Sequence, residues 1–394
     1  MPCNLAVRMF SDLVTQLDNL KSKGLYRCRL TSESPQGTHV SIAGCQYLAF
    51  CSNDYLGLAN HPDLINEARK GARKYGVGTG SSHLISGHYV PHQDLEDRLA
   101  HFTGFPRALL FSTGYMANTG IISALVSHRG EIFADKLNHA SLNDAALLSR
   151  AKFIRYPHLD LAELERRLAA SQAKQKLVAT DAVFSMDGDI APIIELAMLC
   201  DKYDAWLLID DAHGFGILGK QGRGSLSHSN AISPRIIYMA TLGKAAGVSG
   251  AFVAAQTEII ETLIQRAHSY IYTTAMPALL ACTLLKSLTL IQQEEWRRER
   301  LAQLITQLRT ELKPLRWKLL QSTTAIQPLI IGDNSQALRI SKALQVRGIL
   351  IPAIRPPTVP RGTARLRISL SALHKEDDIT QLATALYELS IEIK

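Results

Sequence analysis

The sequence lacks closely spaced cysteines of the kind that bind metals. Their absence informs the predictions of metal binding and of cellular location. The six cysteines stand at positions 3, 28, 45, 51, 200 and 282. None of them makes a C-x-x-C pair or a zinc-finger spacing, so the cysteines indicate no metal site. Unpaired thiols at unpatterned positions suit a reducing cytosol, and we expect a cytoplasmic protein.

Long apolar runs are missing as well. No stretch of 18 consecutive apolar residues occurs, so we expect no segment that spans a membrane. The N-terminus also lacks the charged start and continuous apolar core that a signal peptide needs. Neither membrane association nor secretion is therefore expected.

The sequence also lacks a concentrated cluster of basic residues. The net charge is +8, but the positive side chains are scattered along the chain. The densest run is Arg297-Arg298-Glu299-Arg300, which we interpret as a solvated helix face. We therefore expect no nucleic-acid partner, whereas a phosphorylated or nucleotide-bearing small substrate would fit the charge.

The 394 residues suffice for a large core, and we expect two domains. Short apolar strand patterns alternate with helical ones, which predicts a parallel sheet with helices on both faces. Beyond Pro277 the pattern changes to long helices and a few short strands. We assign residues 1–54 to an N-terminal helix and segment, 55–290 to a large domain, and 291–394 to a smaller α+β domain.

Two predicted strand ends carry residues suited to cofactor chemistry. Lys244 follows the apolar run 236–239 and stands among glycines and other small residues. Loss of hydration there would lower the lysine pKa toward the free amine that forms a Schiff base. The apolar strand 206–209 ends in Asp210, Asp211 and, two residues later, His213. An acid that faces a pyridinium nitrogen, together with a Schiff-base lysine, is the arrangement that pyridoxal phosphate requires.

Two glycine-containing stretches could bind an anion. Residues 112–118 lie where a strand leads into a helix, and Gly114 would let a phosphate approach the exposed N–H groups. An ordinary strand-to-helix turn is the alternative. The loop 76–82 is glycine-rich, but no strand precedes it and no helix begins within it, so it is not a dinucleotide fingerprint. A protein that grips a nucleotide with this loop stays open as the non-enzymatic alternative.

Three histidines have two interpretations each. His139 could lie flat over a cofactor ring, or it could be bonded to backbone at a helix start. His88 and His92 are four residues apart, as metal ligands often are. Pro91 between them and the lack of a third ligand favour a structural role, so we assign no metal.

Two further side chains could serve ligands. Ser185 ends a predicted strand, where it could touch the cofactor or cap the next helix. Arg355 is followed by Pro356 and Pro357, which restrict the backbone. A rigidly placed arginine suits bidentate binding of a carboxylate, and a surface arginine in a proline turn is the alternative.

Taken in order along the chain, these motifs resemble the α-oxoamine synthases. These are fold-type I pyridoxal-phosphate enzymes that condense an amino acid with an acyl thioester and release carbon dioxide. The motifs that carry the resemblance are DDAHG at 210–214, TLGK at 241–244, and Ser86-Gly87 followed by HQDLE at 92–96. The resemblance implies an α/β transferase fold with a large, mostly parallel-sheet domain, a smaller α+β C-terminal domain, and a homodimer.

Within the family, the sequence resembles the branch that joins L-alanine to a pimeloyl thioester in biotin synthesis. The stretch AIRPPTVP at 353–360 and the loop SSHLISG at 81–87 carry this finer likeness, although relatives often have arginine where His83 stands. Whether the acyl donor is pimeloyl-CoA or pimeloyl-acyl carrier protein stays open. Relatives that use glycine or serine share the cofactor machinery.

The resemblance also implies a role for each site residue. Lys244 would hold the cofactor and act as general base, and Asp210 would pair with the pyridinium nitrogen. His213 would bond the ring oxygen, and His139 would stack on the ring. The other expected cofactor contacts are Gly114, Tyr115, Ser185 and Thr241, with Thr273 and Thr274 reaching the phosphate of the neighbouring subunit. The expected substrate contacts are Arg355 and Asn53 for the alanine carboxylate, Arg27 for the acyl substrate, and Thr358.

Overall fold

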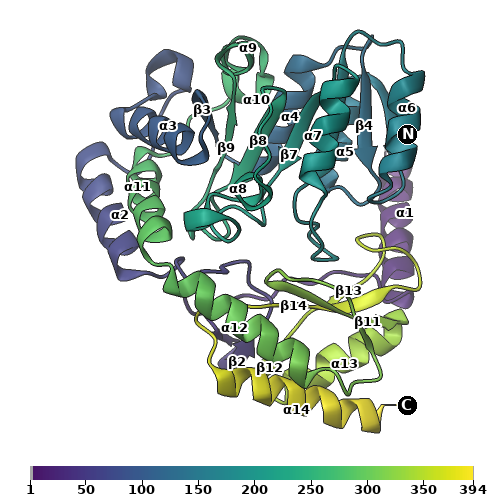
Figure 1. The fold of residues 1–394 in the computed structure, drawn as a ribbon. Helices are drawn as coiled ribbons and strands as arrows, with labels where there is room; N and C mark the ends of the chain where they lie inside the picture. Colours follow the sequence, from purple (N-terminus) through teal and green to yellow (C-terminus); the bar gives the residue numbers. More distant parts are fainter. Residues whose placement is uncertain (1–2, 394) are drawn as a thin grey trace.

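A seven-stranded sheet forms the centre of the large part of the molecule (Figure 1). The computed structural model describes residues 3–393. The spatial strand order is β3-β9-β8-β7-β6-β4-β5, and β9 alone among these runs antiparallel to its neighbours. The strands are β3 (Arg107–Phe111), β4 (Glu131–Asp135), β5 (Lys152–Tyr156), β6 (Lys176–Asp181), β7 (Trp206–Asp210), β8 (Ile236–Thr241) and β9 (Ala251–Ala255).

Helices cover both faces of this sheet, which explains why its strands are apolar at consecutive positions. Along β7, Leu207 and Ile209 pack into one core while Leu208 packs into the other. Among the helices with side chains in the first core are α3 (Val90–Thr103), α6 (Leu161–Ala170), α7 (Ile193–Lys202), α8 (Ser225–Ser229) and α11 (Ala278–Gln293). Those with side chains in the second are α4 (Gly114–Leu125), α5 (Ala140–Leu148), α9 (Thr257–Arg266) and α10 (His268–Ile271).

Two small sheets and three helices form the lower part of Figure 1. One sheet is antiparallel and has the order β10-β11-β14-β13; the other joins β1 and β2 of the N-terminal segment to β12. Their strands are β10 (Lys318–Leu319), β11 (Ile326–Gly332), β13 (Ala353–Ile354), β14 (Ala364–Ser369), β1 (His39–Ile42), β2 (Cys45–Ala49) and β12 (Ile349–Leu350). The helices are α12 (Trp296–Glu311), α13 (Asn334–Val346) and α14 (Glu376–Glu392).

The predicted fold class is confirmed: a large, mostly parallel sheet lies beside a smaller α+β part. The predicted domain limits at 54/55 and 290/291 stay predictions, and α11 runs on to Gln293. Helix α2 spans Pro62–Tyr75. Pro62 opens it, and Gly76 closes it at a φ of 77°, a value that favours glycine.

The interpretation of Arg297 and Arg298 as part of a solvated face is wrong. Both side chains are buried, and their guanidinium groups donate to the carbonyl oxygens of Leu56 and Ile291, at 2.8 and 2.6 Å. The two arginines therefore link the start of α12 to the segment that contains Leu56 and to the end of α11. Local charge patterning contains no trace of such distant carbonyl partners.

Helix α1 (Cys3–Ser22) exposes several apolar side chains. Phe10 is 69% exposed, and Leu13, Val14 and Leu17 are between 46% and 56% exposed. In the described part of the chain, no helix combines the length and apolarity needed to cross a membrane. Cys28, Cys45, Cys51, Cys200 and Cys282 carry free thiols.

Candidate active site

The carboxyl ends of neighbouring parallel strands place several polar residues at one edge of the large sheet. Asp181 and Asp210 end β6 and β7 and lie opposite each other in the register, while Thr241 ends β8. A cavity of about 570 Å³, partly open to solvent, lies at this edge, where open α/β sheets bind ligands. Its lining is Gly114, Tyr115, His139, Ser141, Asp181, Val183, Ser185, Asp210, Ala212, His213, Met239, Thr241 and Lys244.

Lys244 enters the cavity from the turn between β8 and β9. Burial lowers the pKa of its amine to about 8, although the charge of Asp210 opposes this effect. The turn needs glycine at position 247, where φ is +70° and a Cβ would lie 2.6 Å from the backbone carbon of Leu58. The sequence around Lys244 thus provides both the tight turn and the desolvated amine.

His213 lies between Lys244 and Tyr55. Its Nε2 is 2.8 Å from the Lys244 Nζ, and its Nδ1 is 2.6 Å from the Tyr55 hydroxyl. The Tyr55 hydroxyl donates to Asn53 Oδ1, so we assign the His213 proton to Nδ1, which donates to Tyr55. Nε2 then accepts from Lys244. Burial, followed by the Lys244 charge, lowers the pKa of His213 well below its ordinary value.

Asp210 is fixed at the cavity floor by two donors. Asn118 Nδ2 donates to it at 2.8 Å and the Ala212 N–H at 3.1 Å. The neighbouring carboxyl of Asp181 is also buried. Burial and the charge of Asp210 raise the pKa of Asp181 well above its ordinary value. Asp181 therefore favours its neutral form, whereas Asp210 keeps two hydrogen-bond donors.

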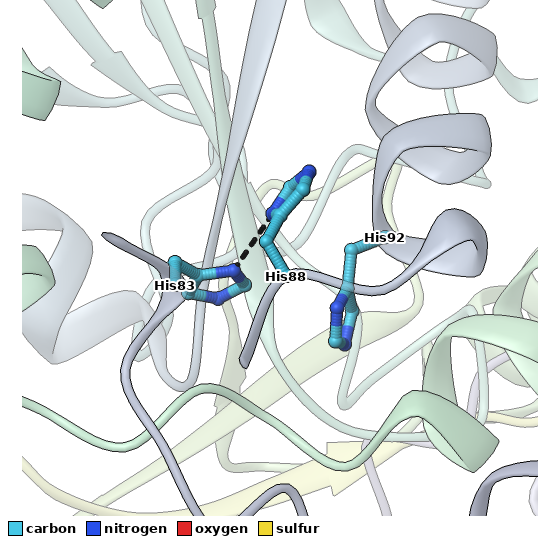
Figure 2. Close-up of side chains that lie close together, drawn as sticks. All are labelled: His83, His88 and His92. Carbon is cyan, nitrogen blue, oxygen red and sulfur yellow. Dashed lines mark hydrogen bonds between the residues drawn. The ribbon is translucent and has the colours of Figure 1, made fainter. Parts of the chain in front are cut away.

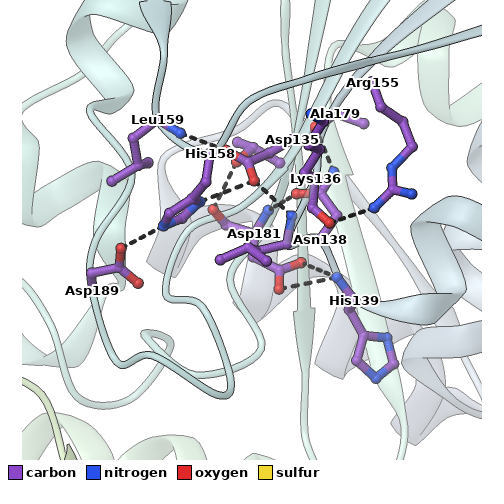
Figure 3. A network of polar contacts seen from close by, with 12 residues as sticks. Asp135, Lys136, Asn138, His139, Arg155, His158, Leu159, Ala179, Asp181 and Asp189 are labelled. Carbon is purple, nitrogen blue, oxygen red and sulfur yellow. Dashed lines mark hydrogen bonds and ion pairs between the residues drawn. The ribbon is translucent and has the colours of Figure 1, made fainter. Parts of the chain in front are cut away.

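His139 caps the N-terminus of α5 and lines the cavity. Its Nδ1 accepts from the Ser141 N–H at 3.3 Å and lies 2.7 Å from the Ser141 hydroxyl, which also accepts from Asn118. Figure 3 shows its backbone N–H directed at the Asp181 carboxylate while its ring extends away from that group. Burial lowers the pKa of His139, so its ring is neutral near pH 7.

A second polar network supports this strand edge (Figure 3). His158 Nδ1 donates to Asp135 at 3.0 Å, and its Nε2 donates to Asp189 at 2.7 Å. Burial alone would lower the pKa of His158, but its hydrogen bonds and ion pairs with both aspartates raise it to about 10. Asp135 also accepts from the Leu137 N–H. The charged His158 thus ties the turn before His139 to the loop that contains Asp189.

Exchange of His158 for glutamine should lower the free energy of unfolding by about 3 kcal/mol near pH 6, because the buried Asp135 and the partly buried Asp189 lose their cation. A raised folded pKa contributes stability in full below the unfolded value near 6.5. That contribution declines as the pH rises through about 10. Urea unfolding of both proteins between pH 6 and pH 10 tests this.

The exposed His228, changed to glutamine, is the matched control for the unfolding experiment. It should follow the wild type at every pH. A stability difference for His158→Gln that stays constant, or grows, between pH 6.5 and pH 10 would refute the charged state assigned to this histidine.

The start of α4 provides an anion site beside these groups. Thr113 caps the helix by accepting from the Met116 N–H at 3.1 Å, and Gly114 and Tyr115 line the cavity. A helix N-terminus favours negative charge. One cavity therefore holds an amine, a carboxylate and a phosphate-binding helix end, and this donor set fits pyridoxal phosphate.

Other predicted site residues lie outside this cavity. Arg27, Arg355 and Thr358 line a separate cavity of about 550 Å³, where Arg27 donates to the Thr358 hydroxyl at 3.2 Å and Arg355 donates to the Gly24 carbonyl. Thr273 is partly buried and Thr274 is exposed. Neither threonine lines the catalytic cavity of the described chain.

Asn53 and two residues that sequence reasoning missed lie behind the cavity. Arg367 of β14 donates to Asn53 Oδ1 at 3.2 Å, to the Ser185 carbonyl and to the Tyr55 hydroxyl. An arginine between the apolar Leu366 and Ile368 was the available signal for it. Tyr55 follows Asn53 closely, but nothing local indicates its contact with His213.

Asp181 and Asn118 were missed as well. Asp181 ends β6, but it stands inside the strand that the sequence predicts to continue up to Ser185, so an acid within an apolar run was the signal that could have found it. Asn118 lies on α4, one turn after Gly114, and its donation to Asp210 depends on the packing of α4 against the sheet. Helical periodicity alone cannot identify that partner.

Known proteins similar to this chain agree with this geometry. The profile of the family described as "Aminotransferase class I and II" matches residues 46–386. The 8-amino-7-oxononanoate synthase of Nitrosospira multiformis is 65% identical over 95% of this chain and 96% of its own. A solved serine palmitoyltransferase with bound pyridoxal phosphate has a TM-score of 0.92 at 29% identity, with 98% of both chains covered. The solved 8-amino-7-oxononanoate synthase of Francisella tularensis has a TM-score of 0.77 at 33% identity, covering 88% of this chain and 99% of its own.

Proposed function

Because this chain belongs to the class I and II aminotransferase family, among its 8-amino-7-oxononanoate synthases, we propose that it condenses L-alanine with a pimeloyl thioester. The products are 8-amino-7-oxononanoate, carbon dioxide and the free thiol. The chain is a pyridoxal-phosphate-dependent acyltransferase of biotin synthesis. The observation that carries the proposal is the convergence of Lys244, Asp210, His139 and His213 on one cavity.

The residues around the cavity would hold the cofactor by three kinds of contact. The N-terminus of α4, with Gly114, Tyr115 and Thr241, binds the phosphate. Asp210 pairs with the ring nitrogen, and His139 packs on the ring face. When bound, pyridoxal phosphate supplies a ring that accepts the electron pair left after a proton is removed from the amino acid.

Lys244 is the residue that moves the proton. Its amine, with a pKa near 8, is suited to take the Cα proton of L-alanine at neutral pH. His213 Nε2, 2.8 Å away, orients the amine. The neutral His213 and the apolar Val183 and Met239 line the same space and limit the water that competes for that proton.

Two arginines are candidates for binding the alanine carboxylate. Arg355 is the sequence-based choice, but it lies in the separate cavity with Arg27. Arg367 contacts the carbonyl of Ser185, a residue that lines the catalytic cavity, and also contacts Asn53. We therefore propose Arg367 as the alternative, with the guanidinium groups of Arg27 and Arg355 facing an anionic part of the acyl substrate.

Exchange of the carboxylate-binding arginine should weaken L-alanine binding by about 2–5 kcal/mol, as for one partner of a buried charge pair. We expect Arg367→Lys to raise KM for L-alanine and Arg355→Ala to raise KM for the thioester. Steady-state kinetics with each substrate varied in turn separate the two roles. The reverse pattern would return the carboxylate to Arg355.

A homodimer is the proposed assembly, and the cytoplasm the proposed location. The exposed apolar side chains of α1 support this proposal, because a second copy of the chain would bury them. Thr273 and Thr274 would then reach the phosphate of the neighbouring subunit. Light scattering of the purified protein measures the assembly, and a monomer at micromolar concentration would refute it.

The substrate assignment is tested by turnover with matched substrates. We expect turnover with L-alanine and pimeloyl-CoA or pimeloyl-acyl carrier protein, and the ratio of the two kcat/KM values identifies the donor. Glycine should bind more weakly than L-alanine without being excluded, since one methyl group gives only about 1–3 kcal/mol of discrimination. Faster turnover of glycine or serine with acetyl, succinyl or palmitoyl thioesters would overturn the assignment.

A further inference from the structure

Three histidines lie together outside the catalytic cavity (Figure 2). His83 belongs to the π-helical turn η1 (His83–Gly87), His88 follows that turn, and His92 lies in the first turn of α3. One ring nitrogen from each lies within 4.8 Å of the other two. His83 supplies the third imidazole whose absence from the local spacing of His88 and His92 had argued against a metal.

We propose that His83, His88 and His92 bind one divalent transition-metal ion of the Zn²⁺ type. Three imidazole nitrogens and one open position for water form a common tetrahedral ligand set for this ion. The ring centroids are 5.1, 5.1 and 5.7 Å apart, so each ring is in contact with the other two. His88 is partly exposed, which gives the ion a route from solvent, while His83 and His92 are buried.

The distance between the facing nitrogens of His83 and His88 is close to the distance expected for two nitrogens bound to one metal ion. Figure 2 shows the two rings pointing toward each other, with their Nδ1 atoms 2.9 Å apart. Nitrogens bound to one tetrahedral zinc lie about 3.3 Å apart, from Zn–N bonds of about 2.0–2.1 Å. A small separation of the rings would therefore admit the ion.

The proton between these rings need not leave the protein. His88 Nε2 lies 3.3 Å from the Gln93 amide oxygen, which can only accept, so the His88 proton belongs on Nε2. Its Nδ1 lone pair already points at His83, whose Nδ1–H donates to it. Transfer of that proton to His83 Nε2 exposes a second lone pair, and both nitrogens can then coordinate the metal.

His92 is the ligand that must give up a contact. Its Nδ1 accepts from the Tyr89 N–H at 3.0 Å, and its Nε2 donates to the Met276 carbonyl at 2.9 Å. Coordination through Nδ1 replaces the hydrogen bond from Tyr89 by a metal bond and keeps the donation of Nε2 to Met276.

Zinc binding by the cofactor-loaded enzyme tests the proposal. After removal of metals with a chelator and of free cofactor by dialysis, equilibrium dialysis against Zn²⁺ should show one saturable site per chain. His88→Gln and His83→Gln should each weaken this binding at least about tenfold. His128→Gln, which changes an exposed histidine elsewhere, is the matched control and should bind as the wild type does.

The thermal midpoint provides the second measurement. Zn²⁺ should raise it in the wild type and in His128→Gln but not in His88→Gln, whose partly exposed side chain makes this the safer variant to fold. Circular dichroism without metal checks that each variant is folded. Absence of saturable uptake by the wild type, or unchanged uptake by folded His88→Gln, would overturn the site and leave a hydrogen-bonded structural cluster.

Discussion

Lys244→Ala should abolish turnover, with a fall of at least about 10⁴-fold in kcat. Two functions end with this side chain: the covalent attachment of the cofactor and the removal of the Cα proton of L-alanine. Its neighbours offer no replacement, because His213 is a much weaker base in its buried position. Product formation, measured at saturating concentrations of both substrates, is the primary readout.

The fold and the non-covalent cofactor contacts should survive this change. The N-terminus of α4 and Asp210 still present their groups to the cavity, so desalted Lys244→Ala should retain cofactor, though more weakly. Borohydride reduction should fix the cofactor to Lys244 in the wild type, as read by peptide mass, and should fix none in the variant. Lys220→Ala, at an exposed lysine, is the control. Measurable turnover by Lys244→Ala would refute the assignment of the base.

The fold could be predicted largely because burial leaves a periodic trace in the sequence. β7 is apolar on both sides, and its residues alternate between two cores, so a run of apolar residues correctly indicated a strand covered on both faces. The ends of helix α2 are marked locally, by Pro62 at its start and Gly76 after its last residue. These features require only residues that are neighbours in the chain.

The part of the cavity that follows strand ends could be predicted from the sequence. Asp210 and Lys244 each follow an apolar strand, and parallel pairing brings those ends together. Arg367 and Tyr55 were missed because they come from distant segments that meet only in the folded chain. The family membership, rather than any single motif, decides against the nucleotide-binding alternative.

Side-chain environment was the least predictable property. Arg297 looked solvated beside its acidic neighbours, yet it is buried against the Leu56 carbonyl. His83 received no metal-binding role because the sequence separates it from His92 by nine positions, whereas the rings lie 5.1 Å apart. Long-range packing decides both cases, and one sequence contains no direct record of it.

Asp210→Asn should retain the fold but lower kcat by about 10²–10³-fold, the effect of removing one strong electrostatic contact from an active site. The carboxylate now accepts from Asn118 Nδ2 and from the Ala212 N–H. An amide group can accept only with its single oxygen, so one of these donors would face an NH₂ group. The ring nitrogen of the cofactor would also lose its negative partner.

Asp211→Asn is the matched control for that experiment, because this neighbouring acid does not line the cavity. Its Oδ2 accepts from the Ser225 N–H and the Tyr238 hydroxyl, both at 2.7 Å, and burial raises its pKa to about 7. An amide oxygen can keep both contacts, so this variant should retain kcat. Isotope exchange of the L-alanine Cα proton with solvent should slow in Asp210→Asn alone. If both variants exchanged that proton at the wild-type rate, Asp210 would have no role in making the proton acidic, and the neighbouring Asp181 would become the candidate partner of the ring nitrogen.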